Sequence, residues 1–538
     1  MLLSDKNVIR QLTALMQAHG VTRCVLCPGS RNAPLTATFE QVFECRLCTD
    51  ERSAGFMALG WAAQCGHPVA VCVTSGSAVL NVHPAVAEAY YRHLPLLVIS
   101  ADRPAAWVGQ QDGQTLPQQG VFGTLARFSG QVPEEDAWHA NRLINEGLLT
   151  LRRHGGGPVH LNLPLSEPFF GMSEGELPRE RVIRHTLFGT DALPDLAPYQ
   201  KILVVMGQTA DDFPADIPLL HGVPVTGDHL GAARLYAPDQ LPPDAALCRL
   251  TSEEEADLIP DLLITVGGSL VPKQLKQLFR RRQPREHWHI SAAGEVADTF
   301  CCLTRVIEGE PAAVLRQFEA PADLSPAFAD RWHKLLRSPV ADIQGFNALS
   351  VVRDTLAALP EQAVLHLANS SAVRYAELFP LPAGVAVQCN RGVNGIEGSL
   401  SAAVGYAAGD ARLNLLIIGD LSFFYDMNAL WLPALPANLR ILLLNNGGGA
   451  IFHALPGIPQ AAAVSAPHHT TAAAWATACG VQVRSVSTEQ EWESALPALL
   501  AADTAAPVLV EVHTDSRTDA AAYRQALRGQ DTPFNNAP

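Results

Sequence analysis

Short apolar runs alternate with segments of helix-like spacing along most of the chain. In the first part, four apolar runs predict strands at 23–27, 45–49, 69–74 and 95–101. The segments between them predict helices at 33–42, 51–65 and 77–93. Strands separated by a crossover helix pair in parallel. The pattern therefore predicts an α/β fold with mainly parallel sheets flanked by helices.

The same alternation appears twice more along the chain. A middle set of apolar runs lies at 201–207, 261–268 and 287–291. A third set, followed by a helical tail, lies at 363–369, 413–420, 440–446, 481–486 and 507–514. Polar, proline-bearing stretches around 173–185 and 319–332 are the expected linkers. The sequence thus predicts three α/β domains, at 1–180, 190–330 and 340–538.

Composition and charge narrow the classes of function. The 538 residues are 48% hydrophobic and 17% charged, which is typical of globular proteins and not of disordered or coiled-coil chains. The net charge of −15 disfavours nucleic acid and anionic membranes as partners. No apolar run approaches the roughly 18 residues of a membrane span, and the first residues lack the apolar core of a secretory signal. We expect a cytoplasmic protein.

Four of the eleven cysteines have a spacing that resembles a zinc site: Cys24, Cys27, Cys45 and Cys48. Both Cys-x-x-Cys pairs lie in predicted strands, where residues three apart point to opposite faces. Such a pair cannot chelate one ion. Buried thiols in a reducing compartment are the favoured interpretation, and structural zinc is the alternative.

Polar residues follow each predicted strand of the first domain. They form loops at 28–32, 50–52, 75–77 and 102–104, which include Arg31 and Arg103. Any single loop could be an ordinary turn or helix cap. In open α/β sheets, however, ligands bind beyond the carboxyl ends of strands, and arginine matches carboxylate or phosphate groups. The four loops together indicate an anionic ligand.

The third domain carries the sharpest signal. Gly419-Asp420 ends one predicted strand, Asn445-Asn446 ends the next, and Asn446 follows Asp420 by 26 positions. Carboxylate and amide oxygens suit Mg²⁺, which shares its remaining coordination positions with phosphate oxygens and water. A metal-bound diphosphate is one interpretation, and a helix cap followed by a common turn is the other. The usual nicotinamide and P-loop fingerprints are absent from the sequence.

These residues carry a resemblance to thiamine diphosphate enzymes, whose plan of pyrimidine, central and pyrophosphate domains fits the three predicted domains. Further segments resemble one family within that superfamily, the 2-succinyl-5-enolpyruvyl-6-hydroxy-3-cyclohexene-1-carboxylate (SEPHCHC) synthases of menaquinone biosynthesis. The segments are CPGSRNAPLT at 27–36, DERSAGFMALG at 50–60, TSGSAVLNVHPAV at 74–86, SADRP at 100–104, NSSAVR at 369–374, NRGVNGIEG at 390–398 and GDLSFFYDMNAL at 419–430.

The resemblance implies a transferase reaction. 2-Oxoglutarate would lose CO2 on thiamine diphosphate, and the remaining four-carbon unit would add to isochorismate in a Stetter-type conjugate addition. Glu51 would hydrogen-bond the aminopyrimidine ring, and Ile396 would be the apolar wedge that bends the cofactor. Arg31 and Gln118 would complete the catalytic set. Without the resemblance, Glu51 is an ordinary acidic residue in the first turn of a helix, and Ile396 is a buried aliphatic residue.

The resemblance also implies the ligands of each group. Asp420, Asn446 and the Gly448 carbonyl would hold Mg²⁺, with Mn²⁺ as a substitute. Other cofactor contacts would come from Ser370, Gly419, Ser422, Ile451 and Phe452. The substrate carboxylates would meet Ser30, Arg31, Arg103, Gln114, Gln118, Lys273, Arg374 and Arg391. This chain has Gln274 where family members often have an arginine after the lysine.

In the superfamily, the two halves of the cofactor site come from different subunits, so the resemblance implies a homodimer or a dimer of dimers. Two alternatives stay open. One is another thiamine diphosphate-dependent 2-oxoacid decarboxylase or carboligase with a different acceptor, although a small neutral acceptor would not require so many arginines. The other is a non-catalytic zinc-binding or regulatory protein on the same fold.

Overall fold

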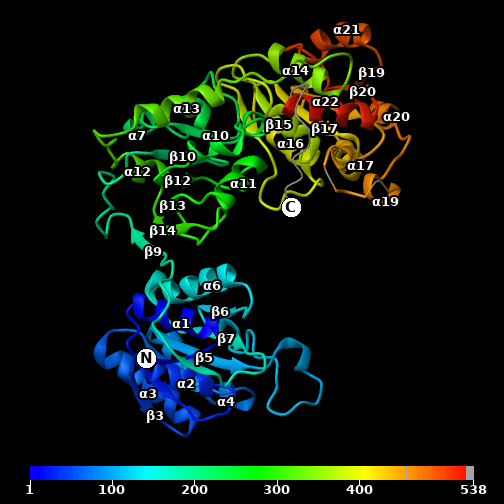
Figure 1. Ribbon diagram of the computed structural model, residues 1–538. Coiled ribbons are helices and arrows are strands. Elements are labelled where there is room, and N and C mark those ends of the chain that lie inside the picture. Colours follow the sequence, from blue (N-terminus) through cyan, green and yellow to red (C-terminus); the bar gives the residue numbers. More distant parts are fainter. Residues whose placement is uncertain (456, 460, 529–538) are drawn as a thin grey trace. The chain divides into compact units, whose positions relative to one another are not determined.

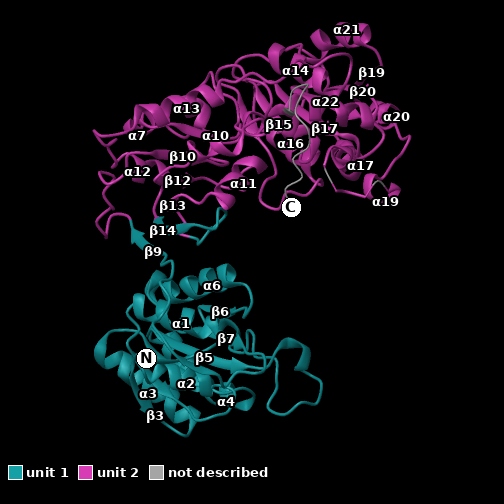
Figure 2. Cartoon of the chain, in the orientation of Figure 1, with its two compact units in different colours: residues 1–187, 295–307 teal, residues 188–294, 308–538 magenta. Residues whose placement is uncertain are grey.

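The computed structural model describes residues 1–455, 457–459 and 461–528. The chain divides into two compact units, residues 1–187 with 295–307 and residues 188–294 with 308–538 (Figure 2). Each unit contains parallel sheets with flanking helices, which confirms the predicted fold class. The boundaries of three separate domains stay a prediction, and the end of the third lies outside the described residues.

The first unit is built on one parallel sheet, shown in blue to cyan in Figure 1. Its order is β3 (Glu44–Leu47), β2 (Arg23–Leu26), β4 (Val69–Val73), β5 (Leu96–Asp102), β7 (Val159–Pro164) and β6 (Phe128–Gln131). One face packs on α1 (Asn7–Ala18), α2 (Ala33–Phe39) and α6 (Ala137–Thr150). The other packs on α3 (Glu51–Cys65), α4 (Ser77–Asn81) and α5 (His83–Tyr91). A short antiparallel pair joins β1 (Leu2–Ser4) to β8 (Met172–Glu174).

The alternation of side chains along β2 decides the arrangement of the cysteines. Cys24 belongs to the apolar cluster on the α1 face of the sheet, whereas Cys27 belongs to the cluster on the α3 face. Cys24 and Cys45 are neighbours in the parallel register of β2 and β3. The prediction that cysteines three apart point to opposite faces is confirmed. Among the described residues, no group of three or more histidines, cysteines or acidic residues could hold a metal ion.

One predicted helix is divided in two. The segment 77–93 forms α4 and α5, with a break at Val82. Pro84 stands in the first turn of α5, where its missing N–H is not needed. Within a continuous helix, proline would instead remove a backbone hydrogen bond and clash with the preceding turn. Among the described residues, no helix is both long and apolar enough to cross a membrane.

The second unit contains four parallel strands from the middle of the chain, in the order β11 (Val225–Gly227), β10 (Ile202–Met206), β12 (Leu262–Val266) and β13 (Glu286–Ser291). Its helices from this region are α7 (Pro218–Gly222), α8 (Ala233–Tyr236), α9 (Asp244–Leu247), α10 (Ser252–Ala256), α11 (Lys273–Arg281), α12 (Pro311–Leu315) and α13 (Pro326–Leu336). Strands β9 (Arg184–Leu187) and β14 (Leu303–Glu308) lie where the chain passes between the units.

The last sheet is parallel throughout. Its order is β16 (Ala386–Gln388), β15 (Val364–Leu367), β17 (Asn414–Gly419), β18 (Leu439–Asn445), β20 (Val508–His513) and β19 (Gln482–Val486). The helices are α14 (Ala348–Ala358), α15 (Ser371–Ala376), α16 (Ser399–Ala408), α17 (Asp420–Asp426), α18 (Ala450–Ala454), α19 (Ala462–Ser465), α20 (Ala473–Ala478), α21 (Glu489–Leu499) and α22 (Ser516–Arg528). Gly419 of β17 is paired with Leu444 of β18. The residues after both strands therefore emerge side by side.

Candidate active site

Glu51 is the first residue of α3. Asp50 caps this helix by accepting a hydrogen bond from the Ser53 N–H at 3.0 Å. Asn81 at the end of α4 donates its amide to the Glu51 carboxylate at 3.1 Å. Gly55 lets α3 lie close to α5, because a Cβ at this position would come within 2.9 Å of the Ala85 Cβ. The helix start and the end of α4 thus fix a half-buried carboxylate at the carboxyl edge of the sheet.

Gln118 is buried, and both the oxygen and the nitrogen of its side-chain amide form hydrogen bonds within the protein. Its Nε2 donates to the Ala101 carbonyl at 3.1 Å and to Asn162 Oδ1 at 2.8 Å, and its Oε1 accepts the Gly76 N–H at 2.7 Å. Both amide hydrogens are therefore donated to protein atoms, so in this arrangement Gln118 has no side-chain donor left for a substrate carboxylate. The proposed substrate contact of Gln118 stays a prediction.

The two arginines that follow strands in the first unit interact electrostatically. Arg31 is buried, donates to the Leu165 carbonyl at 3.1 Å and stacks on the Phe169 ring at 4.3 Å. Burial lowers the pKa of Arg31, and the positive charge of Arg103 lowers it further. Arg103 itself donates to the Gly113 carbonyl at 2.9 Å. Each arginine also has a carboxylate partner in the protein, since Arg31 lies 3.3 Å from Glu167 and Arg103 lies 3.0 Å from Asp112. Ser30, in the same loop as Arg31, and Gln114 are exposed.

Asp420, the first residue of α17, organises the loop after β18. Its Oδ2 accepts the N–H groups of Asn446 at 3.1 Å and Gly448 at 3.0 Å, while its Oδ1 accepts the Leu421 N–H at 2.6 Å. Burial raises the pKa of the Asp420 carboxyl group. Gly448 has a φ of 151°, and a Cβ there would lie 2.7 Å from the Ser465 carbonyl oxygen. The structure thus brings together the three predicted metal ligands.

The residues of this loop fit a divalent cation. The Oδ1 atom of Asn446 is buried without a hydrogen-bond partner. A buried, unpaired amide oxygen is costly unless it gains a ligand. It lies in the same loop as the Gly448 backbone, and the Asp420 carboxylate at the start of α17 is hydrogen-bonded to that loop. Together they form the all-oxygen donor set that Mg²⁺ accepts. The orphaned Asn446 oxygen is the observation that supports a metal here.

Other predicted cofactor residues surround this loop. The Ser422 hydroxyl donates to the Ile396 carbonyl at 2.5 Å, which ties the Ile396 loop to α17. Ile396 is half-buried, and Gly419 is the residue before α17. Ser370 precedes α15 with a φ of 72°. Ile451 and Phe452 lie in α18, where Ile451 is buried and Phe452 is half-buried.

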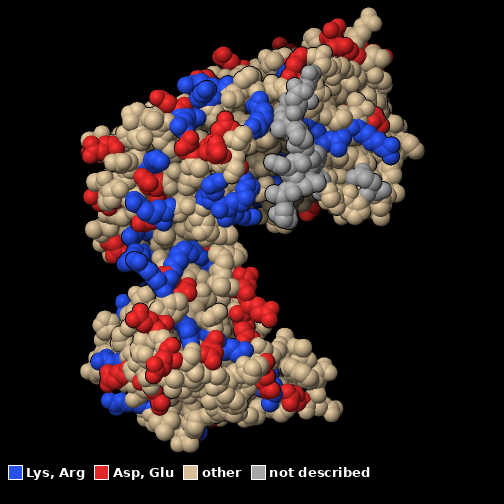
Figure 3. Space-filling model, viewed as in Figure 1, with Lys and Arg blue, Asp and Glu red and all other residues tan. Residues whose placement is uncertain are grey.

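The predicted substrate residues of the second unit differ in burial. Arg391 is buried and donates to Asn369 Oδ1 at 2.9 Å, and Arg374 donates to the Ser370 carbonyl at 2.7 Å. Lys273 is exposed at the start of α11, where basic side chains gather (Figure 3). One turn further along, Lys276 is half-buried, and both burial and the positive charge of Arg391 lower its pKa. Lys276 was not predicted from the sequence.

His468 was also missed, because nothing near it in the sequence indicated a role. Its Nε2 lies 3.3 Å from Asp420 Oδ2, and its Nδ1 accepts the Thr470 N–H at 3.1 Å. The ring also packs edge-on against Phe424. His468 thus belongs to the immediate surroundings of the predicted metal ligands.

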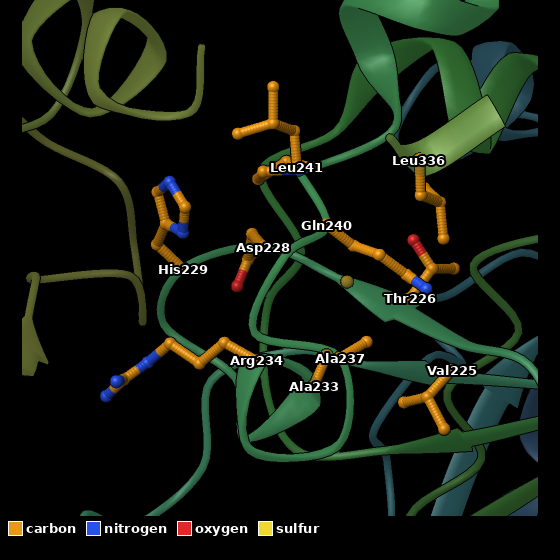
Figure 4. A pocket seen from close by; sticks show the side chains of 12 residues that line it. Val225, Thr226, Asp228, His229, Ala233, Arg234, Ala237, Gln240, Leu241 and Leu336 are labelled. Atoms are coloured by element: carbon orange, nitrogen blue, oxygen red, sulfur yellow. The ribbon is translucent and has the colours of Figure 1, made fainter. Parts of the chain in front are cut away.

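Two pockets lined by described residues do not suit the predicted substrates. One, of about 20 Å³, lies beside β11 and is lined by Thr226, Asp228 and Arg234 among others (Figure 4). Its volume is close to that of one water molecule. The other, of about 530 Å³, lies in the first unit beside Glu134, Glu135 and Asp136. Its acidic lining would repel dicarboxylates.

A buried histidine in the first unit predicts a dependence of stability on pH. His160 shares hydrogen bonds of 2.7 Å with Ser100 and 3.4 Å with Ser129, and burial lowers its pKa from 6.5 to about 4. Below pH 6.5 the unfolded chain binds this proton more readily, so the folded state loses stability as the pH falls. Between pH 7 and pH 5 the loss should be about 2 kcal/mol.

Urea unfolding of the wild type and of His160→Gln at both pH values would measure that loss. Comparing the variant with the wild type removes the contributions of the other titrating groups, which both proteins share. We expect the variant's free energy of unfolding to fall by about 2 kcal/mol less between the two pH values. Equal falls in the two proteins would contradict the assignment to His160.

Comparison with known proteins places the chain in a family. The N-terminal TPP binding domain of thiamine pyrophosphate enzymes matches residues 6–122. A 2-succinyl-5-enolpyruvyl-6-hydroxy-3-cyclohexene-1-carboxylate synthase from Phocaeicola vulgatus is 47% identical over 98% of this chain and 99% of its own length. The chain belongs to this family. Members from Bacteroides thetaiotaomicron (46% identical, 96% of this chain and 97% of the relative) and Desulfotalea psychrophila (39%, 84% and 87%) are also similar.

Membership of the SEPHCHC synthase family confirms the predicted resemblance and the thiamine diphosphate cofactor. It also confirms that the chain is an enzyme and a transferase. The matched N-terminal domain contains Glu51 and Arg31, whereas Asp420 and Asn446 lie far outside it. The roles of individual residues therefore rest on the geometry of each unit.

Proposed function

We propose that this protein is a SEPHCHC synthase that decarboxylates 2-oxoglutarate, adds the four-carbon product to isochorismate in a Stetter-type 1,4-addition and releases CO2. The observation that carries this proposal is the similarity to synthases of that name over nearly the whole length of both chains. Thiamine diphosphate, when bound, supplies the thiazolium ring that accepts the electron pair left by decarboxylation. The protein supplies positioning, proton transfer and electrostatic stabilisation.

We further propose that Asp420, Asn446 and the Gly448 carbonyl hold Mg²⁺ at the diphosphate of the cofactor, with Mn²⁺ as a substitute. The support is the unpaired Asn446 oxygen and the Asp420 carboxylate, which accepts the Asn446 N–H at 3.1 Å. The Gly448 carbonyl accepts the Ala450 N–H at 3.1 Å, which leaves a second lone pair for the ion. Ser370 and Ser422 would contact the cofactor from neighbouring helix starts.

In the first unit, Glu51 would hold a proton on the aminopyrimidine ring. A carboxylate is needed because this proton must be exchanged during activation of the cofactor. The hydrogen bond from Asn81 holds the Glu51 side chain in place at the start of α3. Ile396 would support the bent form of the cofactor from the loop that Ser422 fastens to α17.

Both proposed substrates carry carboxylates, and the arginines supply their partners. Arg31 and Arg103 lie close enough to repel each other in the first unit. Burial lowers the pKa of Arg391 and the positive charge of Arg374 lowers it further, so these two arginines are a second such pair. A carboxylate bound beside either pair would relieve the repulsion within that pair. Gln274 leaves one expected contact of α11 without a cation. Lys276, two positions further along, lies on another side of the helix and donates to the Leu270 carbonyl at 2.6 Å.

The activity is tested with purified protein, thiamine diphosphate and Mg²⁺. We expect release of CO2 from 2-oxoglutarate together with loss of isochorismate. Release of CO2 without loss of isochorismate would favour a 2-oxoacid carboligase with a different acceptor. Stoichiometric zinc in elemental analysis, with no CO2 release, would instead favour the non-catalytic zinc protein.

We propose a homodimer as the minimum active assembly and a cytoplasmic location. The eleven cysteines are all free thiols, as is usual in a reducing compartment. Helix α3 supports the dimer because it is apolar on nearly all sides. It buries Ala54, Ala58 and Leu59 against the sheet, yet leaves Phe56 43% and Met57 40% exposed. A helix that is apolar all round normally has partners on every side.

The exposed face of α3 gives a test of the dimer. We expect Phe56→Arg to shift the protein from dimer to monomer in light scattering after size-exclusion chromatography, because a charge would be buried in the interface. Leu235→Asp is the matched control, since Leu235 is 40% exposed but lies in α8 of the other unit. A variant that stays dimeric would exclude this face of α3 from the interface.

A further inference from the structure

The Asn446 side chain can serve a cation in only one of its two orientations. Its amide has an oxygen that can bind a metal and a nitrogen that cannot. A rotation of 180° about the last side-chain bond exchanges them with little change in shape. The Asn446 backbone N–H is held by Asp420 at 3.1 Å, but that bond fixes the backbone and not the amide. Another group has to select the productive orientation.

Asp519 in α22 makes that selection. Its Oδ2 atom accepts the Nδ2 group of Asn446 at 2.9 Å and the Thr514 hydroxyl at 2.8 Å. Its Oδ1 atom accepts the Ala348 N–H at the start of α14 at 2.8 Å. The Asp519 side chain is fully buried, and a carboxylate with three donors around it can only accept. It therefore takes the nitrogen of Asn446 and leaves the Oδ1 atom unpaired.

We propose that Asp519 is a positioning residue for the metal site, which fixes the Asn446 amide with its oxygen directed to the divalent cation. This inference rests on the proposed role of Asn446 as a metal ligand. Neither the family resemblance nor the strand-end pattern assigned a role to α22. Partners that orient a metal ligand commonly change metal affinity by about 10- to 100-fold when they are removed.

The isosteric variant Asp519→Asn reverses the selection. If its own oxygen stays on the Ala348 N–H, its nitrogen faces Asn446, and Asn446 has to turn its oxygen away from the metal position. If it rotates instead, its nitrogen opposes the Ala348 N–H, and that donor loses its partner. The first arrangement turns the Asn446 oxygen away from the metal, whereas the second keeps it in place but leaves the buried Ala348 N–H unpaired. Because an unpaired buried donor is costly, we expect the first arrangement, which weakens the metal site. We expect Mn²⁺ to bind about 10- to 100-fold more weakly.

The experiment measures Mn²⁺ binding in the presence of saturating thiamine diphosphate, by the loss of the electron paramagnetic resonance signal of free Mn²⁺. This binding measurement does not require catalytic turnover. Asp515→Asn is the matched control, because Asp515 lies just before the same helix, is solvent-exposed and accepts the N–H groups of Arg517 and Thr518. That variant perturbs α22 without touching Asn446, and we expect wild-type Mn²⁺ affinity.

Exchanging the two side chains, with aspartate at 446 and asparagine at 519, distinguishes a positioning role of Asp519 from a purely structural one. In Asn446→Asp alone, two carboxylates would face each other, so we expect weak Mn²⁺ binding. In the double variant Asn446→Asp with Asp519→Asn, the amide at 519 would donate to the carboxylate at 446, whose second oxygen would face the metal. We expect the exchange to recover most of the Mn²⁺ affinity. A merely structural role for Asp519 would give no recovery.

The outcomes distinguish this inference from the proposed function on which it rests. If Asn446→Ala binds Mn²⁺ as tightly as the wild type, Asn446 is not a ligand and the metal proposal fails. If Asn446→Ala loses the metal but Asp519→Asn keeps it, only the role of Asp519 is wrong. If Asp519→Asn fails to fold, the comparison of Asn446→Asp with the double variant still tests the role of Asp519. A double variant that binds Mn²⁺ no more tightly than Asn446→Asp would overturn that role.

Discussion

Glu51→Gln should lower turnover by about 100- to 10,000-fold while thiamine diphosphate still binds. Glutamine keeps the shape of the side chain and its hydrogen-bonding capacity, and Asn81 can still donate to its carbonyl oxygen. It cannot exchange a proton with the aminopyrimidine ring. The measurements are CO2 release from 2-oxoglutarate and cofactor affinity by calorimetry, both at saturating Mg²⁺.

Glu88→Gln is the matched control for this substitution. Glu88 lies in α5 of the same unit and forms an exposed ion pair with Arg92 at 3.7 Å. Exposed pairs of this kind contribute little to stability, so we expect wild-type turnover. Glu51→Gln at the wild-type rate would remove Glu51 from cofactor activation. A loss of cofactor binding equal to the loss of rate would make Glu51 a binding residue only.

Asp420→Ala should weaken thiamine diphosphate binding by more than 100-fold in the presence of Mg²⁺. The substitution removes a charged metal ligand, and it also removes the acceptor for the N–H groups of Asn446 and Gly448. Loss of an ionised partner that leaves buried donors unpaired costs several kcal/mol, and each 1.4 kcal/mol is a factor of ten in affinity. Calorimetric titration of the cofactor at fixed Mg²⁺ measures the change.

The opposite end of the same helix supplies the control. Asp426 ends α17 and accepts the Ser401 N–H at 2.7 Å and the Ser401 hydroxyl at 2.6 Å, away from the loop after β18. Asp426→Ala should keep the cofactor affinity of the wild type. Removal of Mg²⁺ by a chelator should reproduce the Asp420→Ala defect in the wild-type protein. Tight cofactor binding by Asp420→Ala would exclude Asp420 from the metal site.

The alternation of apolar and polar residues predicted the main strands well because parallel strands are buried on both faces and read as continuous apolar runs. The predicted strand at 69–74 is Val69–Val73, and the predicted helix at 51–65 is Glu51–Cys65. Strand β7, an interior strand of the sheet, was not predicted, because His160 and Asn162 interrupt its apolar run. Strand β6, with Phe128 and Gly130 among polar residues, was not predicted either. Its pattern is weak because it is an edge strand, with a neighbour on one side only.

The proximity of Asp420 to Asn446 could be inferred from sequence because both follow neighbouring strands of a parallel sheet. The register of β17 with β18 places the two strand ends side by side. No such rule connects His468 or Asp519 to that loop, since each reaches it from a distant segment. The bonds of Gln118 were also hidden, because its three partners come from separate parts of the chain.

The sequence by itself determined the α/β class and the family, and it predicted the residues of the cofactor site, because these depend on local patterns and motif strings. The tertiary structure decided which atoms of those residues are still available. Asn446 keeps an unpaired oxygen only because α22 brings a buried carboxylate to its nitrogen. Hydrogen-bond partners depend on three-dimensional packing between distant segments, which the spacing of residues along a chain does not record.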